Sequence, residues 1–190
     1  MKHSFSKILV IAVSFVSGVV LAGDNSARIA ESRMVVKSFT TQLKGGLVSA
    51  MQSDGPVGAI SACHIKAPEI AKKISAEKDR RIARTSLKTR NPDNTPDAWK
   101  KKVLQQFEQR KVAGESVEKM EYAEVLDNNG KRKFRYMKAI PTGGVCQTCH
   151  GKNIPPDIAE KLDELYPQDN ARGFSLGDIR GAFTISYSID

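Results

Sequence analysis

Cysteine, histidine and tryptophan are scarce in this sequence of 190 residues, which contains three cysteines, three histidines and one tryptophan. A structural zinc site needs four cysteine or histidine ligands. Apart from one short segment described below, the folded part of the chain offers only the neighbours Cys63 and His64 as such ligands. A zinc-stabilised fold is therefore disfavoured, and any cluster of these rare residues is informative.

Aromatic residues are also few, at 6% of the sequence, although the formal net charge is +9. Proteins that bind nucleic acids usually combine a basic patch with aromatic side chains on which bases stack. Here basic and acidic residues are interspersed, and the run Lys100-Lys101-Lys102 is best interpreted as a solvated helix face. We therefore expect no nucleic acid partner.

The longest apolar run, Ile8 to Val20, is short for a membrane span. Lys2 and Lys7 precede it, and Val20-Leu21-Ala22 follows with residues that a signal peptidase accepts. This pattern predicts a signal peptide at residues 1–22, cleaved after Ala22, with an uncleaved membrane anchor as the alternative. Either places the folded part, expected to be one domain over residues 23–190, in the periplasm or otherwise outside the cytoplasm.

The segment Cys146-Gln147-Thr148-Cys149-His150 contains two of the three cysteines and one of the three histidines. Two thiols at this spacing can form thioether bonds to the vinyl groups of one haem, and the histidine that follows can bind the iron. The segment therefore predicts one covalently attached haem c, with Cys146 and Cys149 as attachment sites and His150 as proximal axial ligand. A redox dithiol or a disulfide is the main alternative, but such a motif normally opens a helix after a strand, and a loop is expected from Pro141 to Pro156.

Cys63 remains without a partner if the other two cysteines bind haem. An unpaired cysteine in an exported protein is an inert buried thiol, half of an intermolecular bridge, or a ligand. The remaining chain stays basic, because removal of Lys2 and Lys7 lowers the formal charge only from +9 to +7. Such a charge would favour docking on an acidic redox partner protein or on anionic lipid headgroups.

The first half of the sequence predicts helices. Apolar residues spaced by three and four positions indicate a helix over residues 27–51, and Asp54-Gly55-Pro56 is expected to end it and to begin another. Cys63 lies near the end of that second helix, because Pro68 is expected to break it before a short helix continues. Thr95 and Pro96 are expected to be the cap and first residue of a later helix.

The second half of the sequence predicts antiparallel strands and one more helix. Residues 120–126 and 131–140 alternate in polarity around the turn sequence Asn128-Asn129-Gly130, and residues 181–189 form another alternating stretch. A short strand is also expected at 81–87, and a helix at 156–165. Helices early and antiparallel strands late define an α+β fold.

The sequence resembles a family of exported PAS-like haem domains that carry c-type haem with histidine and cysteine as axial ligands. The resemblance covers nearly all of the chain after the predicted signal peptide. It rests on the following stretches and single residues: Ala59-Ile60-Ser61-Ala62-Cys63, Ala67-Pro68-Glu69-Ile70-Ala71, Arg84-Thr85-Ser86-Leu87-Lys88-Thr89-Arg90-Asn91-Pro92-Asp93-Asn94, Pro96-Asp97, Trp99, Arg135-Tyr136, the segment from Cys146 to Gly151, Tyr166-Pro167, Asp169, Ala171, Gly173 and Gly177-Asp178-Ile179-Arg180-Gly181.

The resemblance implies a PAS-like antiparallel sheet with N-terminal and flanking helices, and it implies His150 and Cys63 as the two axial ligands. His64 is the alternative distal ligand, because neighbouring helical residues point about 100° apart and only one of the two can face the iron. A methionine ligand or an open distal position is a further alternative. The two haem propionates require cationic partners, for which Arg84, Arg90 and Arg135 are candidates by sequence position.

These observations predict a low-potential haem protein that acts in electron transfer or in redox or gas sensing. A thiolate ligand stabilises ferric over ferrous iron, and its loss on reduction would admit a small gas ligand. The alternative is a haem enzyme, peroxidase-like or a small-oxide reductase, with an open distal site where His64 serves as acid or base. We regard an enzyme as the less favoured interpretation.

Overall fold

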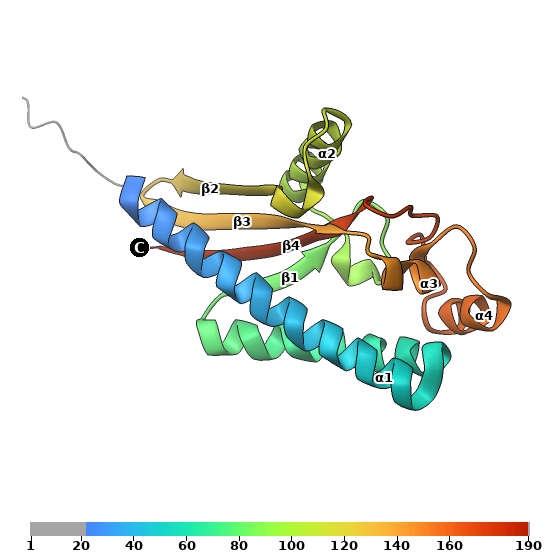
Figure 1. Ribbon diagram of the computed structural model, residues 1–190. Helices are drawn as coiled ribbons and strands as arrows, with labels where there is room; N and C mark the ends of the chain where they lie inside the picture. The colour runs from blue at the N-terminus through green and yellow to red at the C-terminus, as the bar shows by residue number, and fades with distance from the viewer. Residues whose placement is uncertain (1–21, 190) are drawn as a thin grey trace, which may run out of the picture.

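The computed structural model describes residues 22–189, so the predicted signal peptide lies outside the described residues except for Ala22. The structure is α+β, with helices and one antiparallel sheet (Figure 1). None of the helices within the described part of the chain is long and apolar enough to span a membrane. The elements, in chain order, are α1 (Ala22–Lys78), β1 (Arg81–Thr85), η1 (Pro92–Asn94), α2 (Ala98–Val112), η2 (Val117–Lys119), β2 (Glu121–Asn128), β3 (Lys131–Pro141), η3 (Gly144–Cys146), α3 (Gln147–His150), α4 (Pro156–Leu165) and β4 (Ile179–Ser188).

The sheet has the strand order β1-β4-β3-β2, and every neighbouring pair is antiparallel. The predicted hairpin is confirmed as β2 and β3, and the predicted C-terminal strand is confirmed as β4. β4 lies in the middle of the sheet, where Thr85 of β1 faces Ala182 and Tyr136 of β3 faces Ile185. β1 ends before the predicted Leu87 because the backbone N–H of Ser86 turns away to donate to the carbonyl of Asn94.

The helix α1 consists of two halves that meet at Gly55, whose backbone angles (φ 68°, ψ −176°) are not helical. The predicted break at Asp54-Gly55-Pro56 is confirmed, and the two halves fold back beside each other (Figure 1). The predicted break at Pro68 is wrong, since the helix continues through this residue to Lys78. A proline removes one backbone hydrogen bond from a helix. Burial of the neighbouring Ala67 and of Ile74 against the rest of the fold keeps the second half continuous.

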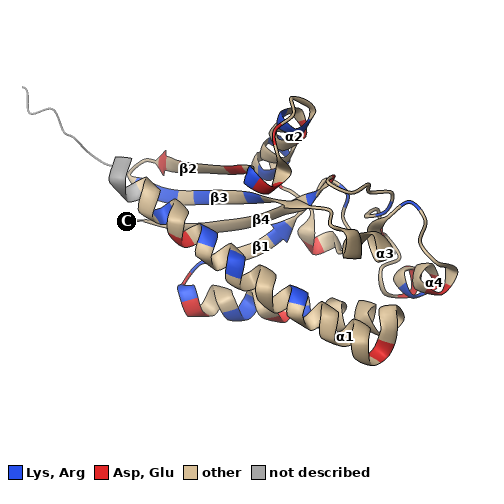
Figure 2. Ribbon diagram, in the orientation of Figure 1, with Lys and Arg blue, Asp and Glu red and all other residues tan. Residues whose placement is uncertain are grey.

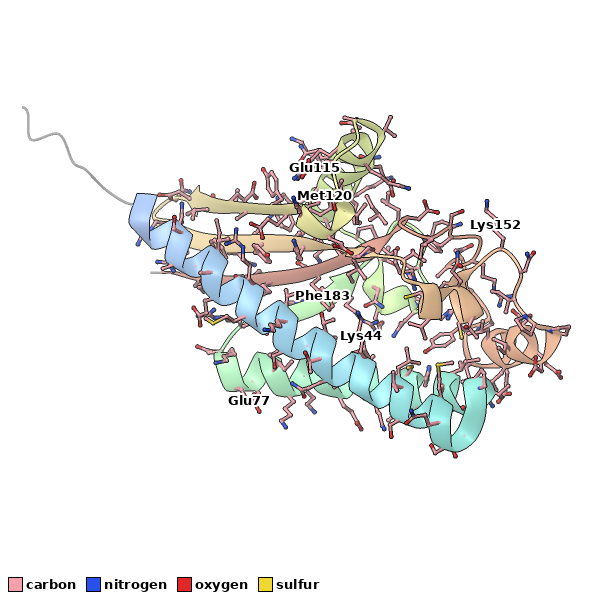
Figure 3. All side chains as sticks on the ribbon, in the orientation of Figure 1. Lys44, Glu77, Glu115, Met120, Lys152 and Phe183 are labelled. Carbon is pink, nitrogen blue, oxygen red and sulfur yellow. The ribbon has the colours of Figure 1, made fainter. Side chains whose placement is uncertain are left out.

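Helices cover both faces of the sheet and bury an apolar core on each. One face packs against α1, and Figure 3 shows the side chains that fill the space between them, with Phe183 labelled on β4. The opposite face packs against α2 and η2, through Val103, Leu104, Phe107 and Val117. The alternation of β3 decides which residue faces which helix: Phe134 and Tyr136 face α1, whereas Met137 and Ala139 face α2.

The helix α2 starts two residues later than the sequence suggested. Its N-cap is Asp97, whose carboxylate accepts a hydrogen bond of 2.9 Å from the backbone N–H of Lys100. The hydroxyl of Thr95, the predicted cap, instead donates to the carbonyl of Pro92 at 2.6 Å. A carboxylate near a helix N-terminus also interacts favourably with the helix dipole, which favours Asp97 over Thr95 at this position.

The helix α4 lies against the second half of α1, away from the main body of the sheet (Figure 1). Ile158 and Leu162 of α4 are buried against Ile60 of α1, and Cys149 packs at the edge of the same cluster. This contact brings the segment between β3 and α4 close to the part of α1 that carries Cys63.

Charged residues are interspersed over the helices and the sheet, with both signs on α1 and on α2 (Figure 2). Many of them form exposed pairs, such as Lys73 with Glu77 and Lys161 with Glu164. Exposed pairs of this kind contribute little to stability, typically about 0–1 kcal/mol each. The described surface therefore agrees with a solvated, mixed-charge protein in which the apolar cores hold the fold together.

We predict that Gly55→Ala lowers the free energy of unfolding by about 1–3 kcal/mol, because only glycine adopts these backbone angles without strain. Gly45 provides the matched control. It lies inside α1 with nothing within 4 Å of an added Cβ, so Gly45→Ala should stabilise the protein by about 0.5–1 kcal/mol. Urea unfolding of both variants measures the difference, and equal effects of the two substitutions would contradict this role for Gly55.

Candidate haem site

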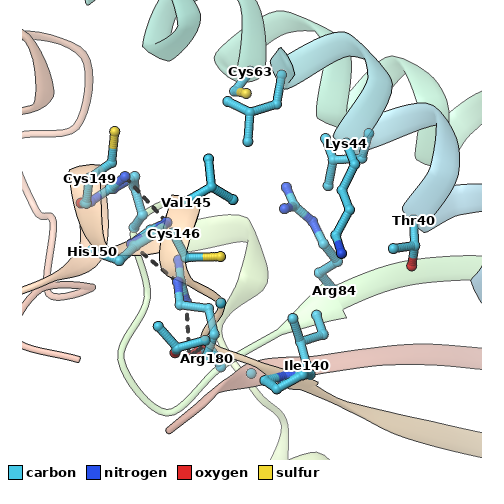
Figure 4. Close-up of a pocket in the computed structure, with 18 of the residues that line it drawn as sticks. Thr40, Lys44, Cys63, Arg84, Ile140, Val145, Cys146, Cys149, His150 and Arg180 are labelled. Carbon is cyan, nitrogen blue, oxygen red and sulfur yellow. Dashed lines mark hydrogen bonds between the residues drawn. The ribbon is translucent and has the colours of Figure 1, made fainter. Parts of the chain in front are cut away.

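A cavity of about 880 Å³ lies between α1, the end of β1, the start of β4 and the segment that joins β3 to α4. Its lining includes every cysteine of the chain and the predicted proximal histidine. Figure 4 shows that these groups come from opposite sides of the cavity, with Cys63 on α1 and the others on the β3–α4 segment. The predicted site residues that line the cavity are Cys63, Arg84, Arg90, Cys146, Cys149 and His150.

The predicted haem-attachment segment folds into two short helical turns, η3 and α3, directly after β3. The expectation of a loop here was wrong, so the loop argument against a redox dithiol does not hold. The helix α3 is only four residues long. Gly151 N–H makes its last helical hydrogen bond, to the carbonyl of Gln147 at 2.9 Å, and the helix ends because the backbone of Gly151 is extended (φ −72°, ψ −174°). A Cβ at position 151 would lie 2.5 Å from that oxygen, which explains the glycine after the histidine.

Backbone hydrogen bonds fix His150 against the segment that precedes β4. The carbonyl of His150 accepts from Phe174 N–H, and the carbonyl of Gly151 accepts from Gly173 N–H, each at 2.9 Å. The imidazole also meets the ring of Phe174 edge to face, with 6.3 Å between ring centroids. The ring position of His150 is therefore set by parts of the chain that lie after α4.

The surroundings of His150 also determine which ring nitrogen carries the proton. Nδ1 lies 2.7 Å from the carbonyl oxygen of Ala171, which can only accept a hydrogen bond. Arg180 Nε–H also approaches Nδ1, at 3.2 Å, but the contact with the carbonyl is shorter. We therefore assign the proton of the neutral imidazole to Nδ1, which makes Nε2 the nitrogen that can bind a metal. Burial, followed by the positive charges of Arg180 and Arg90, holds the pKa of His150 well below its usual range, so the ring stays neutral.

Asp169 and Arg90 form a buried ion pair behind His150. The carboxylate of Asp169 is 1% exposed and accepts a 3.1 Å hydrogen bond from Arg90. Its other oxygen accepts from the backbone N–H of Ala171 at 2.9 Å, the residue whose carbonyl holds His150. Burial alone would raise the pKa of Asp169, but hydrogen bonds from Arg90 and Arg172 lower it below the usual range.

Cys63 and His64 point to different surroundings, as expected for neighbouring helical residues. Cys63 is half-buried and lines the cavity. His64 is exposed and does not line the cavity, and its ring packs edge to face on Tyr166 with 4.9 Å between centroids. Burial raises the pKa of the Cys63 thiol, while the positive charges of Arg84, Lys66 and Arg90 act in the opposite direction.

The three arginines proposed as propionate partners occupy different environments. Arg84 lines the cavity with its guanidinium directed inward (Figure 4). Arg90 also lines it, but its guanidinium is engaged with Asp169 and with the carbonyls of Cys149 and Ala171. The structure does not bring Arg135 to the cavity. It lies on the α2 face of β3 instead, with its guanidinium 5.0 Å from the ring centre of Trp99.

Sequence reasoning did not assign a site role to Arg180, Asp169 or Ala171, although all three support His150. The Nε atom of Arg180 lies 3.2 Å from His150 Nδ1, and burial followed by the charges of Arg90 and Arg84 lowers its pKa to about 10. These residues lie up to thirty positions from His150, so no local pattern links them to it. Their presence in the stretches that carry the family resemblance was the available signal.

The donor set fits an iron porphyrin. Two thiols, a neutral imidazole and a third thiol on the opposite helix line one cavity with cationic side chains, and the Nε2 atom of the imidazole lies 3.5 Å from Arg90 Nη1. Cys63, Cys146 and Cys149 are all free thiols. Within the described residues, no three or more histidine, cysteine or acidic side chains gather where they could share a single metal ion.

Comparisons with known proteins found a matching family and a solved structure of similar fold. The sequence profile described as "Tll0287-like: Tll0287" matches residues 20–188. A solved structure, the crystal structure of the cyanobacterial heme-protein Tll0287, is similar with a TM-score of 0.65 and 21% sequence identity, over 86% of this chain and 96% of that chain. No curated protein matches this chain.

Proposed function

Because the chain belongs to the Tll0287-like family, we propose that it is an exported PAS-like protein that carries a single haem c. In this proposal Cys146 and Cys149 form the two thioether bonds. His150 and Cys63 are the axial ligands, and the protein acts in electron transfer or in redox or gas sensing. The bound haem would supply one-electron redox chemistry, and its low potential follows from thiolate coordination.

The observation that carries the proposal is the state of His150. Its Nδ1 proton is committed to the carbonyl of Ala171, and Ala171 is held in turn by Asp169. Such an arrangement, in which a second hydrogen bond orients the ring and fixes the tautomer, is the usual environment of a metal-binding histidine.

The position of Cys63 supports a six-coordinate site over the enzyme alternative. A peroxidase-like enzyme or a small-oxide reductase needs an open iron position and a distal acid or base, the role that the sequence left to His64. His64 packs on Tyr166 outside the cavity, and Cys63 lines the cavity in its place. Departure of Cys63 on reduction would open a position for a small gas ligand, which is the property that a sensor requires.

We further propose an acidic protein as redox partner and the periplasm as the location, with the signal peptide removed after Ala22. The formal net charge of +7 that remains once Lys2 and Lys7 are removed from the total of +9 supports the first part, since opposite net charges accelerate association. The predicted signal peptide and the thioether chemistry support the second, because c-type haem is attached outside the bacterial cytoplasm.

The experiment that tests this function is mass spectrometry of denatured protein produced in an export-competent bacterium with haem-attachment machinery. We expect a mass equal to the chain after Ala22 plus one haem, and a haem that acid extraction does not remove. The double variant Cys146→Ser with Cys149→Ser should lose the added mass. A wild-type protein without covalent haem, or with Cys146 and Cys149 joined as a disulfide, would refute the proposal.

A further inference from the structure

Two cations at the cavity have no hydrogen-bond or ion-pair partner among the described residues. Arg84 of β1 and Lys44 of α1 both line the cavity, and within residues 22–189 neither makes a hydrogen bond or an ion pair. By contrast, Arg90 is bound by Asp169, and Arg180 donates to the carbonyl of Lys88 and to Ser86. Arg84 and Lys44 are therefore the cationic side chains of this wall that remain available to a ligand.

Arg84 occupies a position where the fold would otherwise place an apolar residue. It follows the buried Ile82 by two positions on β1, so both side chains point to the α1 face of the sheet. It faces Phe183 of β4 across the ladder, and its guanidinium lies 6.0 Å from the ring centre of the fully buried Phe39. A charged residue at a core position breaks the apolar pattern of the strand, which typically marks a functional position.

The free-energy cost of placing the charge of Arg84 at this position indicates an anionic ligand. Burial lowers the pKa of Arg84, yet an arginine side chain keeps its proton in proteins. Arg84 is half-buried and its guanidinium faces the cavity, so a ligand that fills the cavity would remove its remaining water. A guanidinium without water is unfavourable unless an anion or several acceptors meet it. Its planar fork suits a carboxylate in particular, because two parallel hydrogen bonds can form.

The two cations also lie on the side of the cavity where the carboxylates of a haem would lie. Figure 4 shows Arg84 and Lys44 across the cavity from Cys149 and Cys146. In a haem the two vinyl groups and the two propionates project from opposite edges of the ring. Thioether bonds to Cys146 and Cys149 would hold the vinyl edge, so the propionate edge would point towards β1 and the first half of α1.

We propose that Arg84 and Lys44 bind the two propionate carboxylates of the haem. This inference rests on the proposed function. It divides four cationic residues of the cavity into two groups: Arg84 and Lys44 hold the carboxylates, whereas Arg90 and Arg180 lie against His150. The fifth, Lys111, is paired with Asp178. Lys44 also links the propionates to the first half of α1, which covers the sheet.

The test is resonance Raman spectroscopy of the haem-loaded protein, in which the propionate bending bands report hydrogen bonding of the carboxylates. We expect Arg84→Gln and Lys44→Gln each to shift one propionate band to lower frequency, while the bands that report spin state and axial ligation stay unchanged. Two matched controls should leave all bands in place. Lys37→Gln alters another exposed lysine of α1, and Arg135→Gln alters the arginine on the opposite face of the sheet.

The possible outcomes separate this inference from the function on which it rests. Wild-type protein without covalent haem would refute the proposed function itself. Haem-loaded variants with unchanged propionate bands would overturn only the present inference, as would axial-ligand bands that move in Arg84→Gln without any propionate shift. If Arg84→Gln yields no haem-loaded protein, Arg84→Lys, which keeps the charge, decides by the same spectra: a propionate shift supports the inference, and its absence overturns it.

Discussion

Replacement of Cys63 with alanine is expected to raise the reduction potential of the haem-loaded protein by more than ~100 mV, within the ~0.8 V range that axial ligands span. A thiolate is an anionic donor that stabilises the ferric state, so its loss favours reduction. The same variant should change the ferric absorption spectrum from six-coordinate low-spin towards high-spin. A spectroelectrochemical titration measures both effects in one sample.

The matched control for this prediction is His64→Ala. His64 is adjacent in sequence, but its exposed ring packs on Tyr166 instead of lining the cavity. This variant should leave the ferric spectrum and the potential close to those of the wild type. A large spectral change in His64→Ala together with none in Cys63→Ala would reverse the assignment of the distal ligand.

Replacement of Asp169 with asparagine should lower the free energy of unfolding by about 3 kcal/mol. The carboxylate is 1% exposed and Arg90 is 11% exposed, so the substitution leaves a buried guanidinium without its counter-charge. Loss of one partner of such a pair typically costs about 3–5 kcal/mol. The lower end applies here because the amide oxygen of asparagine still accepts a hydrogen bond. Urea unfolding of the two proteins at neutral pH measures the difference.

Asp163 supplies the control for Asp169, because the two carboxylates share Arg172. The side chain of Asp163 is 68% exposed, so Asp163→Asn should change the free energy of unfolding by about 1 kcal/mol or less. Equal losses in the two variants would show that the buried pair with Arg90 contributes nothing beyond an ordinary surface contact.

The contribution of Asp169 should also depend on pH in a defined direction. Its pKa in the folded protein is lower than the value of about 3.9 expected in the unfolded chain. The stabilisation is therefore complete above that value and is lost as the pH falls through the folded pKa. The difference between wild type and Asp169→Asn should narrow in acid, and a difference that widens there would contradict the assignment.

The features that the sequence predicted correctly depend on local patterns. The β2–β3 hairpin follows from alternation around an Asn-Gly turn, and the break in α1 follows from Asp54-Gly55-Pro56. Pro68 was misjudged because the cost of a proline is local, whereas the packing that offsets it comes from distant residues. The support of His150 by Asp169 and Ala171 is likewise tertiary, and no spacing in the sequence indicates it.

The periodicity of the sequence bears on the positions of two predicted site residues, Arg135 and Cys63. Arg135 alternates with Phe134 and Tyr136, which were expected on one sheet face, so its side chain had to point to the other. Cys63 follows the buried Ala59 by four positions, a spacing that places both on one helical stripe. The sequence therefore favours Cys63 over His64 as the residue that faces the core. It does not indicate Lys44, because the place of Lys44 at the cavity depends on the tertiary packing of the first half of α1 beside β1.

The central position of β4 has a consequence for the order in which the molecule can assemble. β1 and β3 do not pair with each other, because each pairs with β4. The complete sheet therefore cannot form until residues 179–188, which make up β4, are available to pair. The pairing of Thr85 with Ala182 joins distant parts of the chain, and contacts of such long range form slowly. Residues 146–150 thus emerge while the sheet is still open, which leaves an interval in which an attachment enzyme would meet an accessible, unfolded peptide.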